Sequence, residues 1–165
     1  MTHANPDHLE TVVHPPESTR IVVAPVTGSV LPLTEVPDPA FASGGLGRGA
    51  AIAPADGTIV APIDGEIIAV MPHAYGIRGG GLDVLVHFGI DTVELGGAHF
   101  APAVSIGELV RAGQVMGSAD VPAIAAAGYA TAVVVVLTNS GDLGDVVPTI
   151  ERSVRSGDAL LTVTV

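Results

Sequence analysis

The sequence predicts an all-β domain, an antiparallel β-sandwich or barrel built from duplicated halves with a few short helical turns. Three observations favour this class: the composition, an internal repeat, and one strand with clear period-two alternation. The 165-residue chain contains 21 Gly and 13 Pro, and aromatic residues make up only 3% of it although 48% is hydrophobic. Many valines between glycine and proline turns are typical of short strands rather than of long helices.

The internal repeat involves two pairs of segments. Residues 22–30 match residues 59–67, and each copy has the pattern of a strand, a turn that starts at proline, and a second strand. Residues 110–114 match residues 154–158, and both are predicted to be tight turns that introduce a strand. These pairs indicate that one β-rich unit occurs twice in the fold.

The individual elements follow from short apolar runs that end at glycine or proline. Residues 1–19 are polar and without periodicity, so we expect a flexible tail before one domain at residues 20–165. Strands are predicted at residues 21–24, 28–33, 50–53, 58–61, 65–71, 74–78, 82–88, 92–94, 114–117, 132–137 and 159–164. Short helical pieces are expected at residues 106–111, 121–127 and 143–150. The expected tail also contains three histidines, which we expect to be solvated: His3, His8 and His14.

Residues 121–140 contain no charged side chain and are long enough to raise the question of a membrane span. Two features argue against a membrane span. The stretch contains Pro122 and Gly128, and its flanks are acidic, Asp120 and Asp142, where a cationic flank is typical. A helical turn followed by a buried strand fits this stretch better. The start of the chain also lacks the apolar core of a signal peptide. We therefore expect a cytoplasmic protein without direct membrane insertion.

The absent residue types exclude several functions. The chain has no Cys, which excludes disulfides, thiolate zinc sites and a cysteine nucleophile. Its six basic residues are all Arg, so a lysine-tethered swinging cofactor, a Schiff-base lysine and a P-loop lysine are excluded too. The net charge of −11 and the scattered arginines argue against nucleic-acid binding. An acidic surface suits a basic protein partner instead.

His87 stands near the end of the best-defined strand, residues 82–88, in which apolar residues alternate on one face. It shares the opposite face with Leu85. His73 lies upstream, beyond a glycine turn at residues 79–81, at a distance along the chain that suits neighbouring antiparallel strands. The two imidazoles are therefore expected to face each other.

A neutral imidazole is a nucleophile suited to group transfer near neutral pH, because its ordinary pKa is about 6.5. Gly89 lets the backbone turn sharply beside the His87 ring. Asp91 is close enough to accept a hydrogen bond from nearby donors, or to cap its own turn. His99 has no evident partner and is expected to be structural or exposed.

A long motif surrounds His87: Leu85-Val86-His87-Phe88-Gly89-Ile90-Asp91-Thr92-Val93-Glu94-Leu95. It resembles the active-site signature of the glucose-type enzyme IIA of the bacterial phosphoenolpyruvate-dependent sugar phosphotransferase system. Three more segments are similar to elements of that family: His73-Ala74-Tyr75, Val36-Pro37-Asp38-Pro39-Ala40-Phe41 and Ala61-Pro62-Ile63-Asp64-Gly65. The resemblance extends over about residues 20–165.

The resemblance implies that His87 accepts a phosphoryl group on its tele nitrogen from the phosphocarrier HPr. It implies that His87 then donates this group to a cysteine of the enzyme IIB domain of a membrane sugar permease, while His73 hydrogen-bonds a phosphoryl oxygen. An apolar docking face is expected around them, with three candidate residues: Phe41, Met71 and Leu85. No cofactor is implied, and His73 and His87 would hold zinc only at a partner interface. Regulatory binding of permeases or metabolic enzymes by the unphosphorylated form is also compatible with the resemblance.

Met71 departs from the family pattern, in which a hydroxyl residue commonly stands two positions before the second histidine. The expected tail also lacks the amphipathic pattern of a membrane-bound helix. The alternative function is a zinc-dependent hydrolase on a related duplicated β-fold, with His73, His87 and a carboxylate as ligands. A catalytic zinc needs three protein ligands, and only two histidines are expected to converge here.

Overall fold

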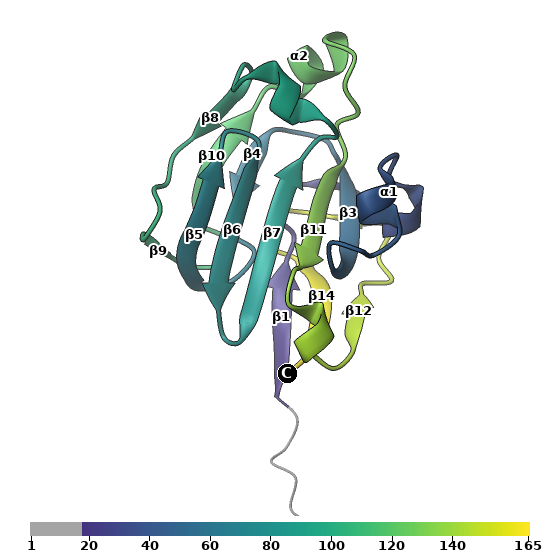
Figure 1. The fold of residues 1–165 in the computed structure, drawn as a ribbon, viewed down its shortest axis with the longest axis vertical. Coiled ribbons are helices and arrows are strands. Elements are labelled where there is room, and N and C mark those ends of the chain that lie inside the picture. Colours follow the sequence, from purple (N-terminus) through teal and green to yellow (C-terminus); the bar gives the residue numbers. More distant parts are fainter. Residues whose placement is uncertain (1–17) are drawn as a thin grey trace, which may run out of the picture.

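The computed structural model describes residues 18–165 as two layers of antiparallel β-sheet (Figure 1). One eight-stranded sheet packs against two separate three-stranded sheets. This arrangement confirms the predicted β-sandwich class. The expected tail lies almost entirely outside the described residues, and Thr19, its last expected residue, already begins strand β1.

The strands are β1 (Thr19–Val23), β2 (Gly28–Leu31), β3 (Arg48–Pro54), β4 (Thr58–Val60), β5 (Gly65–Met71), β6 (Ala74–Gly79), β7 (Leu82–Phe88), β8 (Phe100–Pro102), β9 (Leu109–Val110), β10 (Val115–Ala119), β11 (Val133–Leu137), β12 (Val146–Pro148), β13 (Ser153–Val154) and β14 (Ala159–Thr164). The helices are α1 (Pro39–Ala42) and α2 (Val121–Ala126), and the 3-10 turns are η1 (Leu33–Glu35), η2 (Thr92–Leu95) and η3 (Ser140–Asp142).

The sheet order confirms the predicted duplication. The eight strands run β13-β2-β3-β11-β7-β6-β5-β9, and the small sheets run β1-β14-β12 and β4-β10-β8. Strands β13, β2, β3 and β11 therefore form one half of the large sheet, and β9, β5, β6 and β7 form the other in mirrored order. The two halves meet where β11 pairs with β7.

Reciprocal backbone hydrogen bonds join the two copies of the repeat. Val23 donates its backbone N–H to the carbonyl of Pro62 at 2.9 Å, and Val60 donates to the carbonyl of Pro25 at 2.8 Å. Val23 and Val60 occupy the same position in the two copies, as do Pro25 and Pro62. Such reciprocal contacts are the mark of a self-complementary, twofold-like arrangement.

Three predicted elements are wrong. Residues 92–94 form the 3-10 turn η2 instead of a strand, because left-handed backbone at Gly89 and Asp91 turns the chain at the end of β7. The predicted helix at 106–111 contains strand β9, which pairs with β5. The predicted helix at 143–150 contains strand β12, which pairs with β14. Sheet pairing between distant segments outweighs local helix preference at both places.

Helix α1 and the short strands β8 and β13 are absent from the prediction. The signal for α1 is local: the Asp38 carboxylate accepts the backbone N–H of Ala40 at 2.9 Å, and Pro39 occupies the first helical position. The helical turn and buried strand predicted within residues 121–140 are confirmed as α2 and β11. Within the described part of the chain, no helix is long and apolar enough to cross a membrane.

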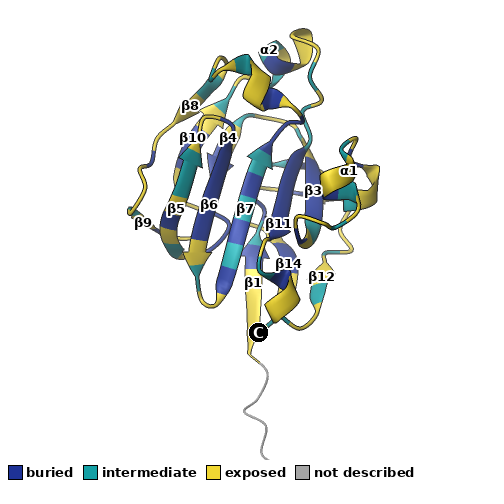
Figure 2. Ribbon diagram, viewed as in Figure 1, coloured by how far each residue is buried: buried dark blue, intermediate teal, exposed yellow. Residues whose placement is uncertain are grey.

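The apolar side chains form two cores. The main core fills the space between the layers. A smaller one lies on the outer face of the large sheet, where the segment of η1 and α1 covers β3 and β11. Its buried members are Val36, Phe41, Ala51, Ile90, Val134 and Val136. Strand β11 is buried along its whole length, whereas β7 alternates between buried and half-buried residues (Figure 2).

Candidate active site

His87 is the next-to-last residue of β7 and belongs to the half-buried, outer face of the large sheet. Its backbone stands opposite Val134 of β11 and Ala74 of β6. The alternation predicted for residues 82–88 is confirmed, with the apolar face buried in the main core. One paired strand on each side, β11 and β6, thus holds the backbone of His87 in place.

The His87 ring is oriented by a backbone carbonyl. Its Nδ1 lies 2.8 Å from the carbonyl oxygen of Gly89. A carbonyl oxygen only accepts hydrogen bonds, so Nδ1 carries the proton in the neutral ring. The lone pair of the neutral imidazole is then on Nε2, which makes Nε2 the nucleophilic nitrogen.

The Gly89 carbonyl is itself fixed by the chain around it. Gly89 has a φ of 78°, and a Cβ added there would collide with the Thr92 side chain. Its backbone N–H donates to Ala132 at 2.9 Å, and the next N–H, of Ile90, donates to Ala130 at 3.0 Å. Glycine is therefore required at this turn for both its conformation and its space.

His73 lies beside His87, as predicted. The ring centroids are 4.9 Å apart and the planes meet at 81°, an edge-to-face arrangement. His73 is only 6% exposed, and its carbonyl accepts the backbone N–H of Phe88 at 2.8 Å. His73 occupies the tight turn between β5 and β6, one residue before β6 begins, which agrees with the predicted strand bounds 65–71 and 74–78.

Both histidines have pKa values below the ordinary 6.5. Burial lowers the pKa of His73. Burial is also the main cause for His87, followed by the nearby charge of protonated His73. The Gly89 hydrogen bond and the carboxylates of Asp38 and Asp91 oppose this shift in the pKa of His87. At pH 7 both rings are accordingly neutral, as a nitrogen nucleophile requires.

Two aromatic rings flank the histidine pair. The Phe41 ring lies 5.1 Å from the His87 ring, and the Phe100 ring lies 6.4 Å from the His73 ring. Phe41 is 4% exposed, so it forms a wall of the site and offers little surface to a partner. Of the other two expected docking residues, Met71 is 42% exposed and Leu85 is half-buried.

The carboxylates near the pair differ from the expectation. Asp91 has a left-handed backbone with a φ of 59°, and its side chain forms no capping hydrogen bond. Asp38, which was not predicted to be a site residue, raises the pKa of His87 through its charge and caps α1. The Pro-Asp-Pro sequence around Asp38 is a helix-start signal that identifies the cap, although it does not reveal the proximity to His87.

His99 is exposed, as expected, and has a left-handed backbone with a φ of 74°. Of the residues the structure describes, no three or more His, Asp or Glu side chains gather closely enough to hold a metal ion. Within residues 18–165, the hydrolase alternative is thus left with two candidate zinc ligands, His73 and His87.

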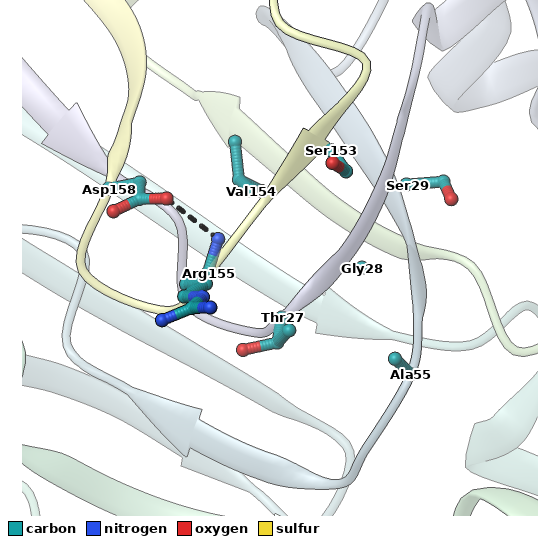
Figure 3. Close-up of a pocket in the computed structure, with 8 residues that line it drawn as sticks. All are labelled: Thr27, Gly28, Ser29, Ala55, Ser153, Val154, Arg155 and Asp158. Carbon is teal, nitrogen blue, oxygen red and sulfur yellow. Dashed lines mark hydrogen bonds between the residues drawn. The ribbon is translucent and has the colours of Figure 1, made fainter.

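A cavity of about 450 Å³ is formed by a different set of residues (Figure 3). It lies where the backbone N–H of Arg155 donates to the Asp158 carboxylate at 2.8 Å. At the equivalent turn of the other copy, the backbone N–H of Arg111 donates to the Gln114 side-chain oxygen at 3.2 Å, beside a cavity of about 420 Å³. Because the cavity recurs with the repeat, it is a feature of the duplicated scaffold.

The fold and the site together define a β-sandwich protein with a paired-histidine centre on the outer face of its large sheet. The chain belongs to the EIIA 1 family of the phosphoenolpyruvate-dependent sugar phosphotransferase system, whose match covers residues 20–143. This membership confirms the resemblance noted from the sequence and makes the chain a phosphotransferase-system component.

Several relatives support the family assignment. The chain is 37% identical over 168 residues to a beta-glucoside-specific EIIBCA component of Halalkalibacterium halodurans, covering 98% of this chain and 26% of the relative. It is 34% identical to a glucose-specific EIIA component of Oceanobacillus iheyensis, covering 76% of this chain and 78% of that protein. The chain thus spans only about a quarter of the first, multidomain relative.

The fold also matches a solved structure, glucose permease IIA from Mycoplasma capricolum. The TM-score is 0.82 at 30% sequence identity, and the match covers 88% of this chain and 96% of that one.

Proposed function

We propose that this chain is a phosphocarrier in which His87 takes a phosphoryl group from HPr and passes it to the cysteine of an enzyme IIB domain. The observation that carries the proposal is the hydrogen bond from His87 Nδ1 to the Gly89 carbonyl. It leaves Nε2 as the free nucleophile, beside a second neutral imidazole. Phosphoryl transfer asks mainly for positioning and charge stabilisation, which this arrangement supplies.

In the first step, the Nε2 lone pair of His87 forms a bond to phosphorus as the bond from phosphorus to the donor's histidine breaks. The electron pair of the broken bond remains on the donor's ring nitrogen. His87 then carries hydrogen on Nδ1 and phosphorus on Nε2, so its ring becomes cationic. The Gly89 carbonyl stabilises this cation through the Nδ1–H hydrogen bond.

In the second step, the thiolate sulfur of the IIB cysteine attacks phosphorus and the bond to Nε2 breaks, returning the electron pair to His87 as a neutral ring with hydrogen on Nδ1. His73 donates a hydrogen bond to a phosphoryl oxygen during transfer, since its ring edge lies next to the His87 ring. Because the group travels on His87, no cofactor is required.

The partners dock on the half of the outer sheet face that the η1 and α1 segment leaves uncovered, which is formed by β7, β6 and β5. Met71 is exposed there and Leu85 half-buried, and a partner covering them excludes water from the reacting phosphoryl group. Asp38 and Asp91 add negative charge, which suits a basic partner such as HPr. Asp91 also favours the cationic form of His87 through its charge.

A IIB partner is supported by the relatives, because the EIIBCA component of Halalkalibacterium halodurans carries this domain together with others in one protein. We propose that the chain works in the cytoplasm beside a membrane sugar permease. Binding of permeases or metabolic enzymes by its unphosphorylated form is a further part of this proposal.

The test is to incubate the full chain with labelled phosphoenolpyruvate, enzyme I and HPr, and then measure acid-labile, base-stable phosphate. His87→Gln is expected to take up no label. His73→Gln is expected to take up label and to pass it on slowly to enzyme IIB. The matched control is His99→Asn, which removes an exposed histidine while tolerating the left-handed backbone. It is expected to behave like the wild type, and undiminished labelling of His87→Gln would overturn the proposal.

A further inference from the structure

We propose that Phe100 is a positioning residue for His73, holding that ring in the orientation that serves phosphoryl transfer. This inference rests on the proposed function of the histidine pair. Phe100 begins β8, which belongs to the small sheet β4-β10-β8, in the layer opposite the histidines' own sheet. It is therefore the other layer of the sandwich that supports the second histidine.

His73 needs such support because packing, rather than hydrogen bonding, holds its ring within the described part of the chain. Among residues 18–165, no hydrogen bond is formed by either nitrogen of this ring. The neighbouring side chains of Pro72 and Ala74 carry no hydrogen-bonding group, and Met71 has only a weakly accepting thioether. The backbone of His73 is fixed by its bond to Phe88, but the ring is oriented by packing alone.

Aromatic contacts supply that packing. The Phe100 ring lies 6.4 Å from the His73 ring at 59°, and 5.9 Å from the Phe88 ring at 75°. Phe88 is fully buried in the main core, so it anchors Phe100 from within. The His73 ring thus has Phe100 as one neighbour and His87 as another, in tilted and edge-to-face contacts typical of aromatic pairs.

The segment before Phe100 packs on the same turn. Gly97 has a φ of 92°, and a Cβ added there would lie 3.4 Å from Pro72, the residue before His73. Phe100 itself donates its backbone N–H to the Gly97 carbonyl at 3.3 Å. Gly97 and Phe100 therefore both pack against the turn that carries His73. Orientation matters here because a misplacement of about 1 Å can cost on the order of 100-fold in rate.

The test compares three variants of the full chain in the labelled transfer assay. Phe100→Leu removes the ring but keeps an apolar side chain, and Phe100→Tyr keeps the ring. Val104→Ala is the matched control, because it removes core packing just after β8 from a residue that belongs to the main core. For each variant, kcat and KM are measured for transfer from the phosphorylated chain to enzyme IIB, together with the amount of label that His87 accepts.

Phe100→Leu is expected to accept full label and to lower kcat of the transfer to IIB about tenfold, with KM unchanged, because only an interaction of the transferring state is lost. Phe100→Tyr is expected to restore kcat to within about twofold, and Val104→Ala to leave it unchanged. An unchanged kcat in Phe100→Leu, or an equal loss in Val104→Ala, would overturn the inference. Failure of the wild type to take label on His87 would instead overturn the proposed function.

Discussion

The two halves of the large sheet have the same strand order but different outer faces. Val86 of β7 and Val135 of β11 stand opposite each other where the halves meet. The next residue along each strand is His87 on β7 and Val136 on β11. Val136 is fully buried under the η1 and α1 segment, whereas His87 is half-buried at the edge of that cover, where only the Phe41 ring of α1 lies against it. Duplication thus supplies the scaffold, and the unequal cover leaves one half free to carry chemistry.

The largest expected effect comes from removing part of the α1 cover over the small core. Phe41→Ala removes a buried ring from the small core, and we expect it to lower the free energy of unfolding by about 3 to 4 kcal/mol. It also uncovers the His87 ring, so the pKa of His87 should rise toward 6.5 as burial decreases. Denaturant unfolding and NMR titration measure the two effects. Ile68→Ala, which shortens an exposed side chain of β5 outside the small core, is the comparison and should cost about 1 kcal/mol; equal costs would contradict the unequal cover.

Gly89→Ala tests how strongly the turn after β7 positions the His87 ring. The variant forces a left-handed alanine against the Thr92 side chain, so we expect a loss of about 2 to 3 kcal/mol in unfolding free energy and reduced labelling of His87. Gly113→Ala is the control, since Gly113 has a similar φ of 89° with open space around it. It should cost about 1 kcal/mol without changing the labelling. Equal labelling of His87 in the two variants would contradict this role of Gly89.

The pH dependence of the unfolding free energy near neutral pH should arise from His73 and His87. Both histidines have folded-state pKa values below 6.5, so below neutral pH the unfolded chain binds more protons than the folded chain. Stability is therefore fully present above about pH 7 and declines as the pH falls through 6.5. Each histidine contributes a slope of at most about 1.4 kcal/mol per pH unit. His73→Gln and His87→Gln should each flatten the curve measured by denaturant unfolding; an unchanged slope in both would contradict this origin.

The smallest expected effect concerns a difference between the two halves of the fold within the main core. At equivalent positions of the repeat, β10 has Gly117 and β14 has the buried Leu161. The hydroxyl of Tyr75 occupies the space beside Gly117. This buried hydroxyl has no hydrogen-bond partner within the described residues, and burial raises the pKa of Tyr75 to about 12. Tyr75→Phe should therefore raise the unfolding free energy by about 1 kcal/mol in thermal or denaturant unfolding. A destabilised variant would indicate that the hydroxyl is satisfied in solution.

Much of the fold was accessible from local patterns. The alternation in residues 82–88 requires one apolar face, and the repeated segments at 22–30 and 59–67 require two copies of one unit, so both follow from the sequence alone. The proximity of His73 and His87 follows from the same pattern, because antiparallel pairing brings the ends of neighbouring strands together.

The tertiary structure alone decided which nitrogen of His87 is free and what surrounds the pair. The Nδ1 hydrogen bond depends on the left-handed backbone of Gly89, which is fixed by carbonyls of Ala130 and Ala132 far along the chain. Phe100 reaches His73 from the other layer of the sandwich. Such contacts depend on how distant segments pack, and local sequence periodicity contains no information about that packing.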